Sequence, residues 1–520
     1  MASTGRQAVG APDDRRQAAL RRCFALIRDV QDGVEGAPVE VGAQLASAER
    51  HQWPEVARAA LFAQAVAALV GEDPAGLRAA VDQLRSGRLT QGDPVALSLA
   101  LIMSASKQRD GTSLAEPGEA ELARASVLLE SADSDGLTLA SAHNTCGLAF
   151  GQRRLWELED FHYAMAEGLL PQCDGTPLAA TVMFNRAELQ VNWACALREV
   201  GNAGEVLERR RAAKEILASA TQVDMPLSWR GELRVVETLL DALCDEGDST
   251  RARCLLDATP PGGQYAGHLL LAIALTDHDE EAAERAVQAV PRAFPEAYDL
   301  ALRTAAELEQ PAGRPRSAAL RYADRHARLR WETRLSSLAV MRSQIEVERR
   351  RGEHDQLTRH AYADDLTGLA NRRGLQRRCV ELEPGEQEGV AVLLVDVDDF
   401  KAINDVHGHQ VGDRALIALA GLLSAAVRTG DLAARIGGDE FAILLPNSDR
   451  QVARQRAEQI VSTVARYPWH QIRESLRLTV SVGVSTAPSA DVESLLSSAD
   501  VGLYQAKAAG GSLAVLAASA

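Results

Sequence analysis

The sequence lacks the features that mark disulfide-rich, zinc-binding or membrane-spanning proteins. Its seven cysteines are odd in number, scattered and without a C-x-x-C pair, so neither a disulfide framework nor a zinc site is indicated. The longest apolar run, HLLLAIAL at residues 268–275, is far shorter than the roughly 20 residues that span a bilayer. The N-terminus also lacks the apolar core of a signal peptide. We therefore expect a cytoplasmic protein with no membrane partner.

Basic residues are too few to favour general binding to nucleic acid. The chain has 56 Lys and Arg against 72 Asp and Glu, a formal charge of -16, which disfavours contact with polyanions. Aromatic residues make up only 4% of a composition that is 46% hydrophobic and rich in Ala and Leu, which favours helices. At 520 residues the chain is too long for one ordinary core. We expect several domains and no nucleic-acid partner.

Residues 15–310 show an almost entirely helical pattern, preceded by a flexible N-terminus at residues 1–14. A weak internal echo places Asn144 and Leu148 in HNTCGLAF, and Asn185 and Leu189 in FNRAELQV, at a spacing that suits a helical hairpin repeat. The region resembles a tetratricopeptide-like α-solenoid, although that family's Trp-Leu-Gly-Tyr pattern is not kept. Two interpretations stay open, an irregular bundle without a ligand and a concave surface for an unknown protein or small-molecule partner.

Residues 318–362 predict one long helix, because they contain no Pro and one Gly and are dense in Arg and Glu. A heptad-like pattern of apolar residues runs along this linker helix. These residues are Ala327, Trp331, Leu338, Met341 and Ile345. Arg334 and Glu348 interrupt the seam. The pattern favours a short, imperfect dimeric coiled coil over a solitary solvated helix.

Residues 363–520 change character and predict an α/β domain. Apolar runs of strand length occur at residues 390–397, 441–446 and 476–484 and alternate with amphipathic helices. Such an order is typical of a sandwich of sheet and helices. The expected fold class is therefore an α-helical, solenoid-like N-terminal region joined by a long helix to an α/β domain.

Acidic residues lie at the ends of two predicted strands. Asp396 ends the first strand, while Asp439 and Glu440 come at the tip of a hairpin that Gly437 and Gly438 make tight. If the two strands are neighbours, the acids converge, and two carboxylates with room for phosphates and water are what Mg²⁺ prefers. For either cluster alone, solvated acids in ordinary turns would be the better interpretation.

Five motifs in the C-terminal region decide between these interpretations. They are DDLTGLANRRG, DVDDFKAINDVHGHQVGD, RIGGDEFAILL, TVSVGV and ADVGLYQAKAAG. Together, and in this order, they resemble the GGDEF family of diguanylate cyclases. The resemblance covers roughly residues 360–515 and implies a palm-like α/β fold. It also implies that each subunit of a homodimer binds one GTP and that the pair makes cyclic di-GMP and two pyrophosphates.

The resemblance further implies two Mg²⁺ or Mn²⁺ ions in each active site. By motif position, Asp396 and Asp439 would hold them, with help from the backbone carbonyl of Val397 and from Glu440. Metal ions in such a site polarise the phosphate and lower the pKa of the attacking hydroxyl. Asp439, Glu440 and Lys401 are the candidate catalytic residues, with Glu440 or a metal-bound route assisting deprotonation.

Substrate contacts follow from the same motifs. Asn404 and Asp413 would bind the guanine edge, whose donors adenine does not present. Lys401 and Lys507 would bind the β- and γ-phosphates. Backbone N–H groups near Asp399 and Phe400 would add to these phosphate contacts.

Two features qualify the resemblance. Gly511 and Ser512 stand where the family commonly has Arg and Asn, and an absent Arg removes a bidentate phosphate donor. Upstream of the hairpin, Arg428 and Asp431 in RTGD match the family's inhibitory site, which binds the product cyclic di-GMP. The alternative is a surface ion pair of little energy.

Three functional hypotheses result. The first is a cytosolic, homodimeric diguanylate cyclase regulated by its helical domain and by product at RTGD. The second is a catalytically weak GGDEF domain that acts as a receptor for cyclic di-GMP or GTP, an alternative kept open by Gly511. The third concerns the N-terminal half, which would be a protein-binding adaptor compatible with either.

Overall fold

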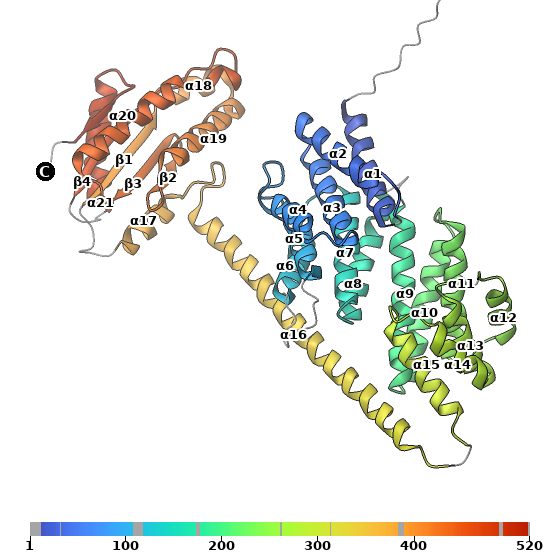
Figure 1. Cartoon of the computed structure of the whole chain (residues 1–520). Coiled ribbons are helices and arrows are strands. Elements are labelled where there is room, and N and C mark those ends of the chain that lie inside the picture. The colour runs from blue at the N-terminus through green and yellow to red at the C-terminus, as the bar shows by residue number, and fades with distance from the viewer. Residues whose placement is uncertain are drawn as a thin grey trace, which may run out of the picture. The chain divides into compact units, whose positions relative to one another are not determined.

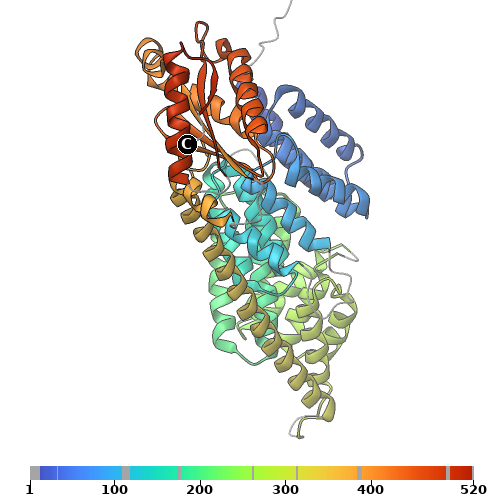
Figure 2. The ribbon, with the colours of Figure 1, turned by 90° about the vertical axis from the view of Figure 1, so that its left-hand side faces the viewer.

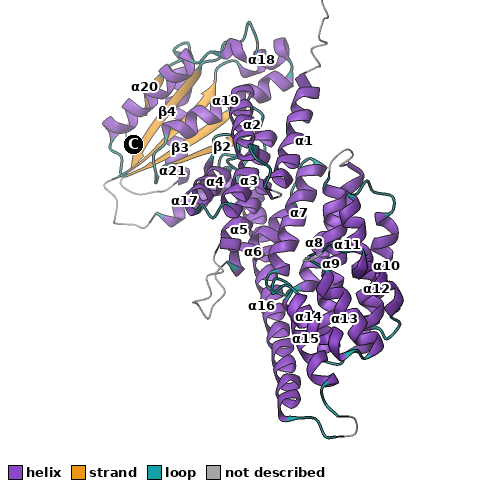
Figure 3. Ribbon diagram, turned by 45° about the vertical axis from the view of Figure 1, so that its right-hand side comes forward, coloured by secondary structure: helices purple, strands orange, loops and turns teal. Residues whose placement is uncertain are grey.

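The structure is a computed structural model that describes residues 12–31, 33–107, 118–172, 177–260, 263–311, 314–382, 389–487 and 492–517. The chain divides into two compact units, residues 1–349 and 350–520 (Figure 1). Strands occur in the second unit, whereas the described part of the first unit is helical (Figure 3). Most of the expected flexible N-terminus lies outside the described residues, and residues 12–14 begin the first helix.

The first unit is built from α-helices that end at Pro, Gly and Asp clusters. Asp side chains accept backbone N–H groups at the start of several of them, as Asp73, Asp135 and Asp248 do. The helices are α1 (Pro12–Gln31), α2 (Ala37–His51), α3 (Pro54–Val70), α4 (Pro74–Ser86), α5 (Pro94–Lys107), α6 (Glu119–Glu130), α7 (Gly136–Gly151), α8 (Trp156–Leu169), α9 (Leu178–Glu199), α10 (Ala203–Ala220), α11 (Leu227–Leu243), α12 (Ser249–Asp257), α13 (Ala266–Asp277), α14 (Glu280–Ala289) and α15 (Pro295–Leu308). A short 3₁₀ helix, η1 (Leu170–Gln172), follows α8.

Consecutive helices of this unit pack against each other, for example α3 with α4, α7 with α8, and α9 with α10. Asn144 on α7 and Asn185 on α9 form the internal echo, and the Asn185 side chain donates to Oδ1 of Asn144 over 3.1 Å. The echo does not extend to Leu148 and Leu189, since Leu148 is exposed and Leu189 is buried. The region is helical as predicted, while its tetratricopeptide-like identity stays a prediction.

The long helix α16 (Ala318–Tyr362) confirms the predicted linker helix, and Figure 2 shows it as one continuous element. Its apolar seam is buried within the helical unit. Leu338, Met341 and Ile345 are 5%, 1% and 7% exposed and share a core cluster with Phe150 and Leu155. The seam that the sequence predicts for a coiled coil therefore packs against the chain's own helices. A heptad pattern does not specify whether its partner belongs to the same chain or to another.

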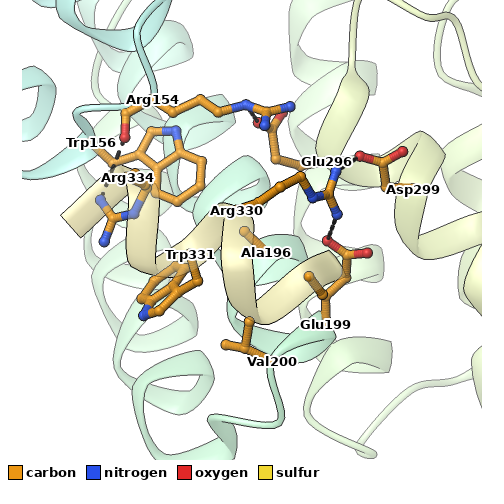
Figure 4. A pocket seen from close by; sticks show the side chains of 11 residues that line it. Arg154, Trp156, Ala196, Glu199, Val200, Glu296, Asp299, Arg330, Trp331 and Arg334 are labelled. Carbon is orange, nitrogen blue, oxygen red and sulfur yellow. Dashed lines mark hydrogen bonds and ion pairs between the residues drawn. The ribbon is translucent and has the colours of Figure 1, made fainter. Parts of the chain in front are cut away.

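Charged and aromatic side chains fix this contact (Figure 4). The guanidinium of Arg334 lies between the indoles of Trp156 and Trp331, 4.7 and 4.2 Å from their centroids, and donates to both oxygens of Glu157. One turn earlier, Arg330 pairs with Glu199 over 2.8 Å and also with Asp299. Arg334, one of the two residues that interrupt the predicted seam, is thus itself only 6% exposed and is paired. Residues 318–349 form an integral part of the helical unit.

The second unit contains one sheet and five helices in its described residues. The helices are α17 (Arg372–Glu381), α18 (Phe400–His407), α19 (His409–Ala426), α20 (Arg450–Arg466) and α21 (Val492–Ala508), with a 3₁₀ turn η2 (Trp469–Gln471). The strands are β1 (Val390–Val397), β2 (Leu432–Gly437), β3 (Glu440–Pro446), β4 (Val480–Ala487) and β5 (Ala514–Leu516). Among the described residues of the whole chain, no helix is both long and apolar enough to cross a membrane.

The sheet has the order β2-β3-β1-β4-β5, antiparallel except for the parallel pair β4 and β5. Side chains of β1 alternate between two cores, since Leu393 and Val395 pack with α19 and α20, whereas Val392 and Leu394 pack with α17 and α21. Burial on both faces explains why this strand is wholly apolar until its last turn. The predicted strand at 390–397 is confirmed. Only the second part of the run at 476–484 forms a strand, since β4 begins at Val480. The short strand β5 does not follow from the sequence pattern.

Candidate functional site

Asp396 lies near the carboxyl end of the central strand β1. It lies on the same face of the strand as Val392 and Leu394, which is the face covered by α21. Its cross-strand partner on β3 is Glu440. Asp396 is only 4% exposed. Burial raises the pKa of its carboxyl group, the negative charges of Asp439 and Glu440 add to this rise, and Lys507 opposes it. The structure thus brings together the acids of both strands, as the motif spacing predicts.

The hairpin between β2 and β3 holds Asp439 and Glu440 at its tip. Gly438 has a φ of 55°, a left-handed conformation that glycine adopts without strain. The backbone N–H of Val397 donates to the carbonyl of Asp439 over 3.3 Å, which ties the tip to the end of β1. Both acids therefore sit beside Asp396 because the turn is tight and the strands are neighbours.

An arginine that sequence reasoning missed supports this tip. Arg435 donates to the carbonyl oxygen of Gly438 through Nε at 3.0 Å and through a terminal nitrogen at 2.7 Å. Its other terminal nitrogen pairs with Asp364 at 3.0 Å, and Asp364 also accepts from the backbone and hydroxyl of Thr367. Burial raises the pKa of Asp364, but the hydrogen bonds from Thr367 and Arg435 outweigh it and leave that pKa lowered. The two residues are 71 positions apart, and the only sequence signal is their place in DDLTG and RIGGDEF.

Lys507 reaches the same site from the last turn of α21. Its Nζ lies 2.7 Å from Oδ1 of Asp396. Burial lowers the pKa of Lys507, but the contact with Asp396 and the nearby charges of Asp439 and Asp398 outweigh it, so the pKa is raised. A cation is thus placed among three carboxylates at the edge of the sheet.

Asn404 and Asp413 lie on two successive helices, α18 and α19, that follow β1. Oδ1 of Asn404 is buried and has no hydrogen-bond partner in the part of the chain that the structure describes. A buried acceptor without a partner costs free energy unless a ligand donor satisfies it. Asp413, one residue beyond the first turn of α19, is exposed.

The start of α18 places backbone N–H groups after the acidic strand end. Asp399 precedes the helix with a φ of 49°, a left-handed conformation that is strained for a residue other than Gly. Phe400 and Lys401 form the first turn, whose N–H groups have no partner within a helix. The side chain of Lys401 is exposed.

Asp398 fixes the turn that follows α21. Its carboxylate accepts from the hydroxyls of Thr479 and Ser481, each over 2.6 Å, and from the backbone N–H of Ser512 over 3.0 Å. Gly511, in the position of the absent Arg, has a φ of 77°, and a Cβ added there would lie 3.0 Å from Oδ1 of this carboxylate. With its contacts satisfied, Asp398 has a structural role that the sequence did not reveal.

The RTGD residues lie elsewhere in the unit, before the start of β2 and so at the opposite end of that strand from the hairpin tip. Arg428 donates its backbone N–H to Asp431 over 3.1 Å and its Nε over 3.4 Å. Asp431 has a side chain that is 2% exposed, whereas Arg428 is 55% exposed. The pair is formed within the chain and leaves part of the guanidinium at the surface.

The donor set fits a hard divalent cation that completes its shell with phosphate and water. Among the described residues, no group of three or more His, Cys, Asp or Glu is arranged to hold a metal ion alone. Asp396, the hairpin acids and the carbonyl of Val397 supply only oxygen, which is the preference of Mg²⁺ and Mn²⁺ over softer metals. Mg²⁺ is commonly bound by one or two carboxylates together with substrate phosphates.

Comparison with known proteins finds a family model that matches most of this unit. Residues 361–512 match the family model described as "Diguanylate cyclase, GGDEF domain". The response regulator PleD of Caulobacter vibrioides is 43% identical over 157 residues, which cover 29% of this chain and 35% of that protein. The diguanylate cyclase DgcM of Escherichia coli is 40% identical over 160 residues, which cover 29% of this chain and 38% of that protein. The chain thus spans about a third of the length of these curated relatives.

A solved structure matches the same kind of unit. The crystal structure of the coiled coil and GGDEF domain of DgcB from Caulobacter crescentus in complex with c-di-GMP is 32% identical. The match covers 36% of this chain and 99% of that chain, with a TM-score of 0.31.

Proposed function

Because residues 361–512 carry a GGDEF domain, we propose that this chain is a diguanylate cyclase. It would condense two GTP molecules into cyclic di-GMP and two pyrophosphates across a homodimer. The observation that carries the proposal is the convergence of Asp396, the hairpin acids and Lys507 at one edge of the sheet. Acids and a cation in this arrangement suit a nucleotide triphosphate bound with divalent metal.

The residues around this edge divide the work on GTP. Asn404 and Asp413 accept hydrogen bonds from the guanine edge, and the buried Oδ1 of Asn404 would lose its partner if adenine were bound. Lys401, Lys507 and the first N–H groups of α18 bind the β- and γ-phosphates. These contacts orient the α-phosphate toward the two-fold axis of the dimer.

Asp396, the carbonyl of Val397, Asp439 and Glu440 would hold two Mg²⁺ or Mn²⁺ ions. When bound, such ions polarise the α-phosphate and neutralise the leaving pyrophosphate. Glu440 stands opposite Asp396 and is placed to take the proton from the 3′-hydroxyl of the GTP on the partner subunit. Arg435 and Asp364 keep the hairpin tip in place while this occurs.

Two further parts of the chain would regulate the reaction. Arg428 and Asp431 would bind cyclic di-GMP, since Arg can stack on guanine and pair with phosphate. The helical unit would act through α16, which is packed into that unit as far as Ile345 and continues to Tyr362. A change in the helical unit would then move the start of the catalytic unit.

The test is synthesis of cyclic di-GMP from GTP and Mg²⁺ by the full-length protein. We expect product from wild type and none from Asp439→Ala or Glu440→Ala. Glu458→Ala is the matched control, because Glu458 is an exposed acid paired with Arg454 on α20 and should leave the rate unchanged. Retained turnover in Asp439→Ala would remove the proposed metal assignment.

The alternative is a receptor, favoured by the absence of an arginine at position 511. In that case wild type would bind cyclic di-GMP at Arg428 and Asp431 yet make none from GTP. Isothermal titration with cyclic di-GMP, together with the synthesis assay, separates the two functions. Binding without synthesis selects the receptor, and synthesis selects the enzyme.

A further inference from the structure

Lys507 contacts the same oxygen that the proposed metal site needs. Its Nζ lies 2.7 Å from Oδ1 of Asp396, whose side chain is 6% exposed. A metal ion bound to this oxygen would share it with the ammonium, and the two positive charges would repel each other. Lys507 therefore competes with a metal ion for Asp396.

The two members of this ion pair differ in exposure, so that the ammonium of Lys507 can dissociate from the carboxylate of Asp396. The Nζ of Lys507 lies within ion-pair distance of Oδ1 of Asp396, and among the described residues no other donor to this oxygen is found. The side chain of Lys507 is 46% exposed, so its ammonium can exchange the carboxylate for water or phosphate without burial of an unpaired charge. Asp396 is the buried member and has the greater need for a counter-ion.

Hydrogen bonds hold the turn that follows Lys507. Three residues after Lys507, the chain enters the turn at Gly510 and Gly511, and the carboxylate of Asp398 accepts the N–H of Ser512 just beyond it. Hydroxyls of Thr479 and Ser481 anchor that carboxylate to the approach to β4 and to β4 itself. The end of α21 is thereby held beside the sheet. Asp398 already accepts these three hydrogen bonds, and its negative charge also acts on Lys507.

We propose, on the basis of the cyclase site described above, that Lys507 exchanges partners during substrate binding. It neutralises Asp396 when no metal ion is bound, and it moves to the β- and γ-phosphates when a divalent cation takes that oxygen. Metal binding and phosphate binding then assist each other, since the cation releases the ammonium that the phosphates need.

The exchange predicts that one substitution raises the affinity for Mn²⁺ and lowers the affinity for nucleotide. Lys507→Met removes the competitor, so the nucleotide-free protein should bind Mn²⁺ more tightly. The same variant lacks a phosphate ligand, so it should bind a non-hydrolysable GTP analogue more weakly. A lysine that served only as a phosphate ligand would give the second effect without the first.

Lys401→Met is the matched control for net charge. Lys401 is also a lysine near the strand end and is exposed, but no contact with Asp396 is found for it among the described residues. Both variants lose one positive charge, and only Lys507→Met frees Asp396. A general electrostatic effect would therefore change Mn²⁺ affinity similarly in both.

The experiment measures free Mn²⁺ by electron paramagnetic resonance during titration of the full-length protein without nucleotide. We expect Lys507→Met to bind Mn²⁺ roughly 5- to 30-fold more tightly than wild type, a factor that corresponds to about 1–2 kcal/mol. This exceeds the range of an exposed ion pair because Asp396 is buried. Lys401→Met should change the affinity less than about threefold. Asp396→Asn should abolish the tight site in every background.

Each result decides the proposal. Equal Mn²⁺ affinities in Lys507→Met and Lys401→Met, or a weaker affinity in Lys507→Met, would overturn the exchange. If wild type makes cyclic di-GMP in that case, the cyclase proposal stands alone. If Lys507→Met binds Mn²⁺ more tightly while wild type makes no product, the exchange stands in a receptor. Loss of Asp396 without effect on Mn²⁺ binding would overturn both the exchange and the metal assignment. Lys507→Gln repeats the test if Lys507→Met does not fold.

Discussion

Replacement of Arg334 by Ala should destabilise the helical unit strongly, because Arg334 links α16 to it. The side chain is 5% exposed and its guanidinium donates to Glu157 at 2.8 and 3.1 Å. Loss of one partner from a buried pair costs about 3–5 kcal/mol. Glu157 is 22% exposed and can recover water, which places this loss at the low end. The two indole contacts add about 0.5–2 kcal/mol, so we expect a total near 3.5–5 kcal/mol.

Urea denaturation followed by tryptophan fluorescence measures this loss. The chain has six Trp residues, and all except Trp469 lie in the helical unit, so the emission reports chiefly on that unit. With a denaturant dependence of about 1–3 kcal/mol per molar urea, the midpoint should fall by at least roughly 1 M. Arg342→Ala, an exposed arginine on the same helix, is the control and should change stability by less than about 0.5 kcal/mol.

Arg334→Met separates the pair from the packing. Met retains an apolar stem between Trp156 and Trp331 but cannot pair with Glu157. Its midpoint should fall between those of wild type and Arg334→Ala. A shift in Arg334→Ala no larger than that of Arg342→Ala would show that α16 contributes little to the helical unit and would refute this interpretation of the contact.

The remaining predictions concern other parts of the chain. Burial raises the pKa of Glu159 from its ordinary value of 4.5 to about 8, so the folded state keeps this carboxyl group protonated. Its contribution to the free energy of unfolding is therefore fully present below pH 4.5 and is lost as the pH rises toward 8. Melting curves should therefore show Glu159→Gln gaining on wild type by on the order of 1 kcal/mol per pH unit across that window, and parallel curves would contradict the shift. Gly511→Arg should lower KM for GTP roughly tenfold in steady-state assays, with a small loss of melting temperature from the positive φ; an unchanged KM would mean that position 511 does not reach phosphate. Arg428→Ala should leave the initial rate unchanged while product inhibition weakens, and equal inhibition in progress curves would assign the pair a structural role only.

The sequence predicted the parts of the site that lie within continuous motifs. Asp396 at a strand end and Asp439 at a glycine turn follow from local patterns, and their meeting follows from the pairing of neighbouring strands. The contact of Arg435 with Asp364 could not be predicted from the sequence. The chain contains many other arginines and acids that could pair with either residue, and only the fold brings these two together. The hydrogen bonds from the hydroxyls of Thr479 and Ser481 to Asp398 could not be predicted for the same reason.

The helical unit shows the same limit in its packing. Hydrophobic periodicity predicted helices, and the long helix at residues 318–362 is confirmed. The periodicity of Leu338 and Ile345 also suggested a partner chain, but these residues fill the core of their own unit. Period alone gives the face of a helix that is buried, and the identity of the covering surface depends on the rest of the fold.

This packing constrains how a homodimer could form. Exposure of the buried seam to a second copy would remove Leu338, Met341 and Ile345 from the helical core and break the pair of Arg334 with Glu157. Burial of three such side chains contributes about 1.5–3 kcal/mol each, so the release of the seam would compete with most of the stability of a typical domain. A dimer that preserves the helical unit must therefore use other surfaces. The opposite face of α16, where Val340 and Val347 are 51% and 60% exposed, remains accessible while the seam stays packed. If the helical unit regulates the second unit as proposed, α16 must therefore move together with the core into which its seam is packed.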